Sequence, residues 1–377
     1  MSLQDYFFWK RADTLEKPAG IHIVLAHRLS AYYNHHMRTI IAEAPMRIDF
    51  AGGTLDIPPL YLFHQPALTI NIAIDIMALV SAASSEKTVV VSRDQKKSAE
   101  WATHNDISWK EHPELELILR ALKAFDPKEH LRLEVSSEAP VGSGLGASSS
   151  IAIALVAALS RTQGKEFSFA ELVEYAKSIE TQTIKVPTGY QDYWAAVYGG
   201  AHAYEMGLDG RVRVARLGTD AFLTSVEEHM VLAYAGKPHF SGTNNWELYK
   251  RHIDGDKATI RFFEELKENA LFMKDAFGRG NIGQVADALF RDWRTRKAML
   301  PAMTTPEIET LFKKTLQAGA LAGRVCGAGG GGCVLLLVPP EKRAAVNSCI
   351  QKIGMRALPA KISKKGVSAK IVSGVKK

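Results

Sequence analysis

The sequence contains few cysteines and no long hydrophobic run. Of its 377 residues only three are cysteines (Cys326, Cys333 and Cys349), and their spacing does not match a metal site. An odd number of thiols is typical of a reduced intracellular protein rather than of a disulfide-bonded secreted one. The longest apolar stretches, such as 151–159, are far too short to span a bilayer, and the first residues lack the apolar core of a signal peptide. We therefore expect a cytoplasmic protein that binds no membrane.

A strong charge of one sign is also missing. The formal net charge is only +7, and outside the C-terminal tail lysine and arginine do not form runs longer than two or three residues. Nucleic-acid binding requires a basic stripe, so we expect no nucleic-acid partner. The modest positive charge is compatible with a basic pocket for an anionic substrate. The 46% apolar content suffices for a substantial core in one to three domains.

The hydrophobic pattern predicts strands and helices that do not alternate strictly. Apolar residues at every second position from Leu68 to Ala78 predict a half-buried strand, and 89–91, 131–135 and 334–338 are further strand candidates. Helical spacing and capping residues predict helices near 115–125, 169–179 (after the capping box Ser168–Glu171), 259–277, 282–299 (after Asn281) and 307–321 (after Thr305). This order favours an α+β protein of two fused domains.

The segment 140–150, Pro-Val-Gly-Ser-Gly-Leu-Gly-Ala-Ser-Ser-Ser, is the most informative part of the chain. Its three alternating glycines are free to adopt positive φ, and its three serines stand where an apolar helix begins. A helix start presents unpaired N–H groups, so the segment predicts a phosphate cradle. A tight turn before a buried helix would explain only one or two of the glycines. The dinucleotide pattern GxGxxG/A is formally present, but residues 138–140 separate it from the preceding strand, whereas a Rossmann turn follows its strand directly; GxxxxGK[ST] is absent.

Two further segments accompany this loop. Residues 324–333 contain four consecutive glycines before an apolar strand, which indicates close approach of another chain segment or of a ligand. Residues 44–56 read Ala-Pro-Met-Arg-Ile-Asp-Phe-Ala-Gly-Gly-Thr-Leu-Asp. In this order and at these separations, the three segments resemble the motifs of the GHMP small-molecule kinases, over about residues 42–340.

The resemblance implies a particular architecture. It predicts an N-terminal domain like the second domain of ribosomal protein S5, over 39–212, and a ferredoxin-like C-terminal domain, over 213–377. The active site is expected between them. Residues 1–38 would then form an N-terminal extension to which we assign no role, and a homodimer is compatible with the sequence.

The resemblance also assigns the binding of ATP and Mg²⁺. The glycine loop would surround the ATP phosphates, through Pro140, Gly142, Ser143, Gly144, Leu145, Gly146, Ala147, Ser148 and Ser149. Mg²⁺, which prefers hard oxygen ligands, would be bound by Ser148 and Glu180. Ala147 departs from the usual serine pair of the family, so Ser149 is an alternative ligand, and helix capping is an alternative role for Ser148. Surface solvation is the alternative for Glu180, which is expected near a helix end.

Two residues are expected to carry the chemistry. The resemblance places Asp192 beside the attacking hydroxyl, in what the sequence predicts to be a loop. Arg47 would keep that carboxylate ionised and hold negative charge on the transferred phosphoryl group. Because a guanidinium cannot act as a base, proton acceptance would fall to Asp192. Alignment alone is the alternative, since phosphoryl transfer tolerates the absence of a base.

The substrate class follows from the first segment. Gly-Gly-Thr-Leu-Asp-Ile-Pro resembles a sugar-kinase branch that includes heptose 7-phosphate kinase and L-fucokinase. The substrate contacts implied are Gly53, Asp56, Gly189, Gln191, Gly329 and Gly330. Asp56 would accept hydrogen bonds from sugar hydroxyls, or else serve as a turn residue. Leu55 departs from the branch pattern and is expected to place a bulky group near the sugar. The stretch 239–250 would face the substrate or, as we favour, cap the next helix through Thr243 or Asn244.

The sequence therefore predicts an ATP- and Mg²⁺-dependent kinase that phosphorylates a hydroxyl of a sugar or sugar phosphate. A mevalonate- or homoserine-type kinase would change the substrate only. A nucleotide-binding sensor without catalysis would change the class, but the presence of Arg47, Ser148, Glu180 and Asp192 argues against it. A dehydrogenase is the remaining, weaker alternative. The sequence leaves open which sugar is used and which hydroxyl is phosphorylated.

Overall fold

The computed structural model describes residues 39–236 and 241–372, and within 241–245 it describes the backbone only. The extension expected at 1–38 lies outside the described residues, as does the start of the 239–250 stretch.

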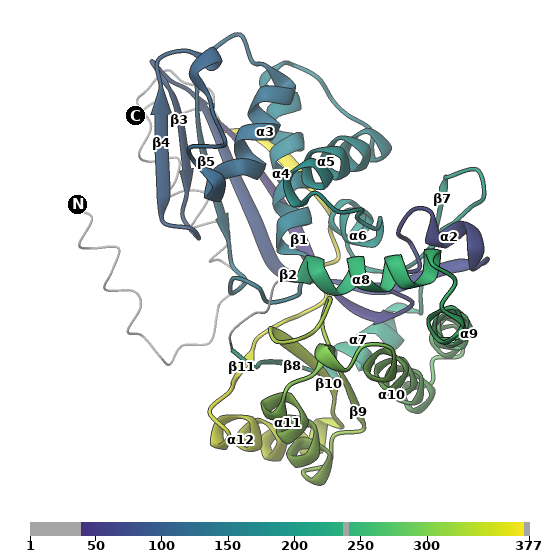
Figure 1. Ribbon diagram of the computed structural model, residues 1–377. Coiled ribbons are helices and arrows are strands. Elements are labelled where there is room, and N and C mark those ends of the chain that lie inside the picture. Colours follow the sequence, from purple (N-terminus) through teal and green to yellow (C-terminus); the bar gives the residue numbers. More distant parts are fainter. Residues whose placement is uncertain (1–38, 237–240, 373–377) are drawn as a thin grey trace.

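The first domain is built on an eight-stranded sheet (Figure 1). Six strands follow the order β12-β1-β2-β5-β3-β4, while β6 pairs with β2 and with β7. The pairs are antiparallel except for β3 with β5. The strands are β1 (Thr39–Ala51), β2 (Ala67–Ser84), β3 (Thr88–Ser92), β4 (Lys97–Trp101), β5 (Leu131–Ser137), β6 (Ala201–Met206), β7 (Val212–Arg216) and β12 (Ser368–Val372).

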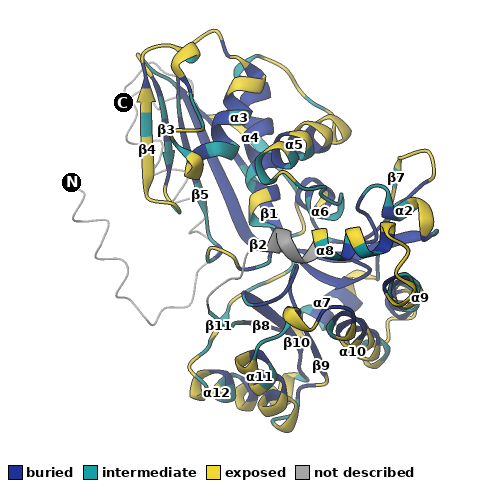
Figure 2. Cartoon of the chain, viewed as in Figure 1, coloured by how far each residue is buried: buried dark blue, intermediate teal, exposed yellow. Residues whose placement is uncertain are grey.

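Helices of the first domain gather on one face of this sheet (Figure 1). They are α3 (Glu116–Phe125), α4 (Ala147–Thr162), α5 (Phe169–Ile184) and α6 (Gln191–Tyr198). A short helix, α2 (Leu60–Phe63), connects β1 to β2 along the chain. The α4 segment 152–160 is buried throughout, since it packs against β1 and β2 under α3, α5 and α6 (Figure 2). This central helix begins at the glycine loop, so the loop is held rigidly by the core.

The second domain has a four-stranded antiparallel sheet of order β11-β8-β10-β9. Its strands are β8 (Met230–Tyr234), β9 (Ala322–Val325), β10 (Cys333–Leu337) and β11 (Arg356–Leu358). Its helices are α7 (Asp220–His229), α8 (Ser241–Ile253), α9 (Lys257–Gly278), α10 (Ile282–Met299), α11 (Pro306–Gln317) and α12 (Arg343–Lys352). The two domains together confirm the predicted α+β class.

Most elements predicted from the hydrophobic pattern are present. Ser168 and Glu171 form the expected capping box, and Asn281 and Thr305 cap α10 and α11. Two details are wrong. Helix α11 ends at Gln317, four residues early, and α8 begins at Ser241, so Thr243 and Asn244 lie inside the helix instead of capping it.

Strand β2 is buried on both faces rather than on one. The alternating apolar residues, such as Ile70, pack in one cluster with Met273 and Phe277 of α9. The intervening residues are also covered: Asn71, for example, donates a hydrogen bond to the Gln191 carbonyl at the start of α6. The half-buried expectation fails because β2 lies between first-domain helices and α9.

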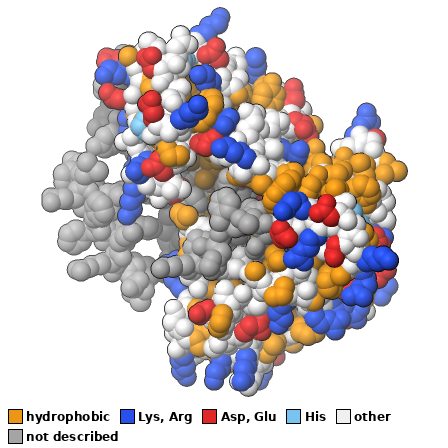
Figure 3. All heavy atoms as spheres, viewed as in Figure 1, with side chains coloured by type: hydrophobic (Ala, Val, Ile, Leu, Met, Phe, Trp, Pro, Cys, Tyr) orange, Lys and Arg blue, Asp and Glu red, His pale blue; other side chains and the backbone are white. Residues whose placement is uncertain are grey.

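The first sheet includes strands from the part of the chain that was expected to form the second domain. Strand β7 crosses the expected boundary at 212, and β12, near the end of the chain, pairs with β1 of the first sheet. Figure 3 shows one face of the molecule, on which acidic and basic side chains are interspersed. No helix in the described part of the chain is long and apolar enough to cross a membrane.

Candidate active site

The glycine loop ends in an open helix start. Helix α4 begins at Ala147, as expected, and its N-cap is Gly146, so no side chain caps it. The first intrahelical bond runs from Ser150 N to Gly146 O, which leaves the amides of 147–149 available. An uncapped helix N-terminus is an anion site, because N–H groups and the positive end of the dipole face outward. The capping role considered for Ser148 is wrong, since Ser148 is the second helical residue.

The second glycine segment packs directly on this loop. Cys333 N donates to Ser143 O at 2.8 Å, and a Cβ atom on Gly327 would lie 3.0 Å from Gly144 O. Close approach of another chain segment therefore explains these glycines. Gly329 and Gly330 instead contact Met303, whose carbonyl accepts from Gly330 N at 2.8 Å. Their expected substrate contact stays a prediction.

Not every residue of the loop is positioned to face a ligand with its side chain. Leu145 is fully buried in the apolar core, so only its backbone can line the cradle. Ser143 is also buried, and its hydroxyl has no hydrogen-bond partner among the described residues. Ser148, by contrast, is exposed at the helix start.

Arg47 and Asp192 form a bidentate ion pair beside the cradle. Arg47 Nε donates to Asp192 Oδ1 at 2.7 Å, and Nη2 donates to Oδ2 at 2.9 Å. Arg47 Nη1 also donates to Gly144 O at 2.6 Å, which connects the pair to the loop. A Cβ on Gly146 would lie 3.3 Å from Asp192 Oδ2, so the carboxylate lies against the start of α4. Asp192 belongs to the first turn of α6, not to a loop as the sequence suggested.

Burial and charge oppose one another in this pair. Burial raises the pKa of Asp192 above its ordinary value, although the adjacent Arg47 lowers it. Burial disfavours the Arg47 cation, but Asp192 and Asp49 outweigh this effect and raise the pKa of Arg47. Arg47 is therefore always charged, while Asp192 is the group able to exchange a proton.

Glu180 is a buried carboxylate near the helix start. Ser149 Oγ donates to Glu180 Oε2 at 2.8 Å, and burial raises the pKa of Glu180 while hydrogen bonds from Tyr193, Ser148 and Ser149 lower it. Surface solvation, the alternative for this residue, is wrong. Among the described residues no ion pair involves Glu180, and no group of three or more His, Cys, Asp or Glu is arranged for a metal. One carboxylate and one exposed hydroxyl fit Mg²⁺ only where phosphate oxygens and waters complete its shell, which is its usual habit in phosphate sites.

Asp56 has a role that the sequence did not reveal. Its side chain is buried, and Oδ2 accepts hydrogen bonds from the backbone N–H groups of Tyr190 (2.5 Å) and Gln191 (2.7 Å). Asp56 therefore fixes the first turn of α6, and that turn also contains Asp192. Gly189 is required there, because a Cβ would collide with the Asp56 carboxylate. Burial raises the pKa of Asp56 to about 6, against these two hydrogen bonds.

Two acceptor oxygens beside this turn have no partner. Asp56 Oδ1 and Gln191 Oε1 are buried and make no hydrogen bond within the described residues. The Gln191 side chain lies against Gly53, where a Cβ would be 2.9 Å from its Nε2. Buried acceptors without donors cost free energy, so these two oxygens match a ligand that donates hydrogen bonds.

Leu55 does not reach this place. It is fully buried in an apolar cluster with Leu60 and Phe263, so the expectation of a bulky group near the substrate is wrong. The preceding Thr54 has φ of 82°, a conformation that β-branched residues rarely adopt. The first motif thus contains local strain, which often accompanies functional sites.

The sequence reasoning missed four buried charged residues behind the site: Asp49, Asp292, Arg296 and Arg324. Asp292 and Arg296, four residues apart on α10, have the spacing of an ordinary surface ion pair. Arg324 is the first residue of the second glycine segment, and Asp49 stands two residues after Arg47 in the first motif. The positions of Arg324 and Asp49 inside these motifs are the only local sign in the sequence that the two residues belong to the site.

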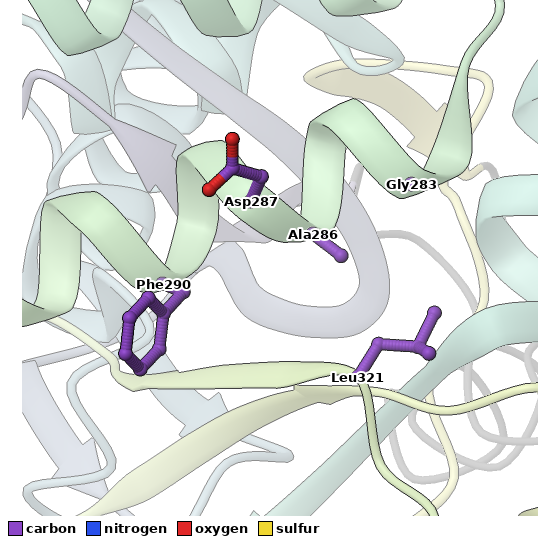
Figure 4. A pocket seen from close by; sticks show the side chains of 5 residues that line it. All are labelled: Gly283, Ala286, Asp287, Phe290 and Leu321. Carbon is purple, nitrogen blue, oxygen red and sulfur yellow. The ribbon is translucent and has the colours of Figure 1, made fainter.

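A surface hollow of about 310 Å³ lies elsewhere, on the second domain (Figure 4). Gly283, Ala286, Asp287 and Phe290 of α10 and Leu321 line it. Its carboxylate is already paired with Arg291, and none of the predicted site residues lines it. The hollow is therefore separate from the site built around the cradle.

Two α+β domains meet at a glycine-lined helix start, an arrangement suited to binding an anion such as a phosphate group. The family model for the N-terminal domain of GHMP kinases matches residues 116–200, and that for the C-terminal domain matches 273–354. Both domain models of the GHMP kinases therefore match this chain, and the proteins similar to it are kinases.

The similar proteins point to the sugar-kinase branch. D-glycero-alpha-D-manno-heptose 7-phosphate kinase from Campylobacter jejuni is 26% identical over 299 residues, 78% of this chain and 87% of its own. A mevalonate kinase from Methanothermobacter thermautotrophicus is 22% identical over 285 residues, 71% of this chain and 82% of its own. Among solved structures, a D-glycero-D-manno-heptose 1-phosphate kinase from Bacteroides thetaiotaomicron superimposes with a TM-score of 0.72 at 20% identity, covering 88% of this chain and 99% of its own.

Proposed function

We propose that this protein transfers the terminal phosphoryl group of ATP to a hydroxyl of a sugar or sugar phosphate. The observation that carries the proposal is the pair of unpartnered acceptors, Asp56 Oδ1 and Gln191 Oε1, beside Asp192. A polyol donates several hydrogen bonds and would satisfy both oxygens. The similarity to heptose phosphate kinases supports the same substrate class.

ATP would bind with its phosphates against the cradle. The uncapped start of α4 and the loop from Pro140 to Ser149 supply backbone N–H groups and a positive dipole end. Glu180 and Ser148 would bind Mg²⁺, which supplies charge neutralisation for the phosphates. Ser149 is the weaker ligand candidate, because its side chain is buried whereas Ser148 is exposed at the helix start.

The Arg47–Asp192 pair would act on the acceptor hydroxyl. Asp192 takes the proton from the hydroxyl as its oxygen attacks the γ-phosphorus, and the bond from phosphorus to the bridging oxygen of ADP breaks. Arg47 stays protonated and faces the negative charge of the transferred group. Because most of the barrier reduction in phosphoryl transfer comes from alignment and electrostatics, Asp192 would also serve by positioning the hydroxyl.

The same geometry favours hydroxyl groups over a carboxylate at the place beside Asp192. A carboxylate there would require a cation, and the nearby arginines are engaged: Arg47 by Asp192, and Arg296 by Asp292. The free polar atoms near Asp192 are acceptors instead. A mevalonate-type kinase is the second candidate, supported by the similarity to archaeal mevalonate kinase.

Turnover of ATP against an acceptor panel tests the proposal. The panel would contain heptose 7-phosphate, free heptose, fucose, galactose, glucuronate, mevalonate and homoserine, each with Mg²⁺. Turnover with a neutral or phosphorylated sugar is the expected result, and turnover with glucuronate alone would contradict the argument against a carboxylate beside Asp192. Turnover only with mevalonate or homoserine would overturn the sugar assignment, and ATP binding without turnover on any acceptor would favour the sensor.

A further inference from the structure

We infer that a buried ion-pair network of the second domain positions the Arg47–Asp192 pair. The network consists of Asp292, Arg296 and Arg324, and it reaches Arg47 through Asp49. The inference rests on the proposed function, because it concerns how that active site is assembled. None of these residues needs to touch a substrate, so they would be positioning residues.

The first part of the network clamps the first motif onto α10. Arg296 Nε donates to Asp292 Oδ2 at 2.7 Å, and both side chains are almost completely buried. Arg296 Nη2 donates to Gly53 O at 2.6 Å, and Gly52 N donates to Asp292 Oδ1 at 3.2 Å. The backbone of residues 52–53 is therefore held from the second domain. The clamp also restrains the turn that contains the strained Thr54.

The second part connects the clamp to the catalytic pair. Arg324 Nη1 on β9 donates to Asp292 Oδ2 at 2.8 Å, and its Nη2 lies 3.8 Å from Asp49 Oδ2. Asp49 also accepts from Gly327 N at 3.1 Å. Asp49 Oδ1 lies 3.0 Å from Arg47 Nε. A continuous series of contacts thus runs from α10 to Arg47.

Two carboxylates compete for one atom of Arg47. Its Nε lies 2.7 Å from Asp192 Oδ1 and 3.0 Å from Asp49 Oδ1. Arg324 supplies Asp49 with a second cation, so that Arg47 keeps its bidentate geometry on Asp192. Without Arg324, the uncompensated Asp49 would attract Arg47 and turn the guanidinium away from the catalytic carboxylate.

The charges of the network support a role in positioning the Arg47–Asp192 pair rather than in stabilising the fold. Three arginines (Arg47, Arg296, Arg324) face three aspartates (Asp49, Asp192, Asp292), so the formal charges cancel. Buried ion pairs rarely stabilise a fold more than apolar side chains of the same volume, although removal of one partner is costly. A network of this size is better explained by the geometry that it imposes on the site.

The test compares Arg324→Met with the double variant Asp49→Asn/Arg324→Met. In the single variant we expect a crystal structure to show Arg47 turned toward Asp49. We expect kcat to fall at least about tenfold while the KM for ATP stays within about twofold, because the cradle is untouched. In the double variant, the neutral amide at position 49 no longer competes, so the Arg47–Asp192 contact and most of kcat should return. If Arg324 and Asp49 had only structural roles, the losses of kcat caused by the two substitutions would add in the double variant.

A matched control lies on the same helix. Arg291 forms an exposed ion pair with Asp287 at the same four-residue spacing, so Arg291→Met should leave kcat unchanged. The inference is overturned if Arg47 stays on Asp192 in Arg324→Met with kcat intact, or if the double variant loses the contact. If Arg324→Met alone fails to fold, the structure of the double variant still tests the inference, because loss of the Arg47–Asp192 contact there would overturn it. The crystallographic comparison needs no substrate, so it judges the network even if every acceptor in the panel fails.

Discussion

A Cβ atom on Gly144 would lie 2.5 Å from the carbonyl oxygen of Cys326. The two residues belong to the two glycine segments, one from each domain, and the absence of a side chain lets the backbones touch. The glycine loop before the open start of α4 and the link between the domains therefore depend on the same glycine.

Substitution of Gly144 should damage both stability and nucleotide binding. Gly144→Ala introduces strain at positive φ of about 1 kcal/mol and a collision with backbone that cannot move aside, which we expect to cost roughly 2 kcal/mol more. Gly164→Ala is the matched control, since Gly164 has a similar φ with nothing near its Cβ. Denaturant unfolding and ATP titration measure the difference, and equal losses for the two variants would contradict the close approach.

Removal of the Asp192 charge should affect turnover much more than ATP affinity. Asp192→Asn keeps the shape of the side chain but cannot accept a proton, so kcat should fall by about 10² to 10⁴. The KM for ATP should stay near its wild-type value. Asp275→Asn, at an exposed ion pair with Arg279, controls for the loss of a negative charge. Near-normal kcat in Asp192→Asn would leave alignment as the role of this residue.

Asp56 should give stability a distinct pH dependence. Its pKa is raised to about 6 by burial, so between about pH 4 and pH 6 the folded chain holds a proton that the unfolded chain has released. Its contribution is therefore lost as the pH rises through this window, by on the order of 3 kcal/mol. Asp56→Asn removes this component, so the difference in unfolding free energy between the variant and wild type should move in the variant's favour from pH 4 to pH 6. A difference that is flat with pH would mean that Asp56 titrates normally.

Two of the three serines at the start of α4, Ser148 and Ser150, should respond differently to substitution. Ser148 is exposed at the cradle, whereas Ser150 Oγ donates to Pro45 O inside the core. If Ser148 binds Mg²⁺, Ser148→Ala should raise the Mg²⁺ concentration needed for half-maximal turnover severalfold. Ser150→Ala should change stability by about 1 kcal/mol without altering the Mg²⁺ requirement. The same Mg²⁺ dependence in both variants would remove Ser148 from the metal site.

The fold and part of the site could be predicted from local signals in the sequence. The periodicity of α9 and α10 and the caps Ser168, Asn281 and Thr305 act within a few residues, so they are visible in the chain. The glycine loop likewise shows its helix start locally. Asp56 was recognised as important, but its bonds to Tyr190 and Gln191 join positions more than 130 residues apart. No local pattern reports such a contact.

The same limit explains the errors. The departure of Leu55 from the sugar-kinase pattern predicts a bulky group near the substrate, but only the packing around Leu55 shows that its side chain enters the core. The Asp292–Arg296 spacing is shared by surface ion pairs such as Asp287–Arg291, and burial alone distinguishes the two. Burial arises from the whole fold, which the local sequence does not contain.

The pairing of β12 with β1 has a consequence for biosynthesis. The first domain begins at β1, yet the neighbour of β1 on its outer side is made from residues 368–372. While the chain is being translated, β1 therefore has an open edge throughout synthesis of the second domain, and an open edge invites pairing with other chains. The first domain is completed last, although it is made first, so a nascent chain released before β12 emerges would carry an exposed strand rather than a finished first sheet.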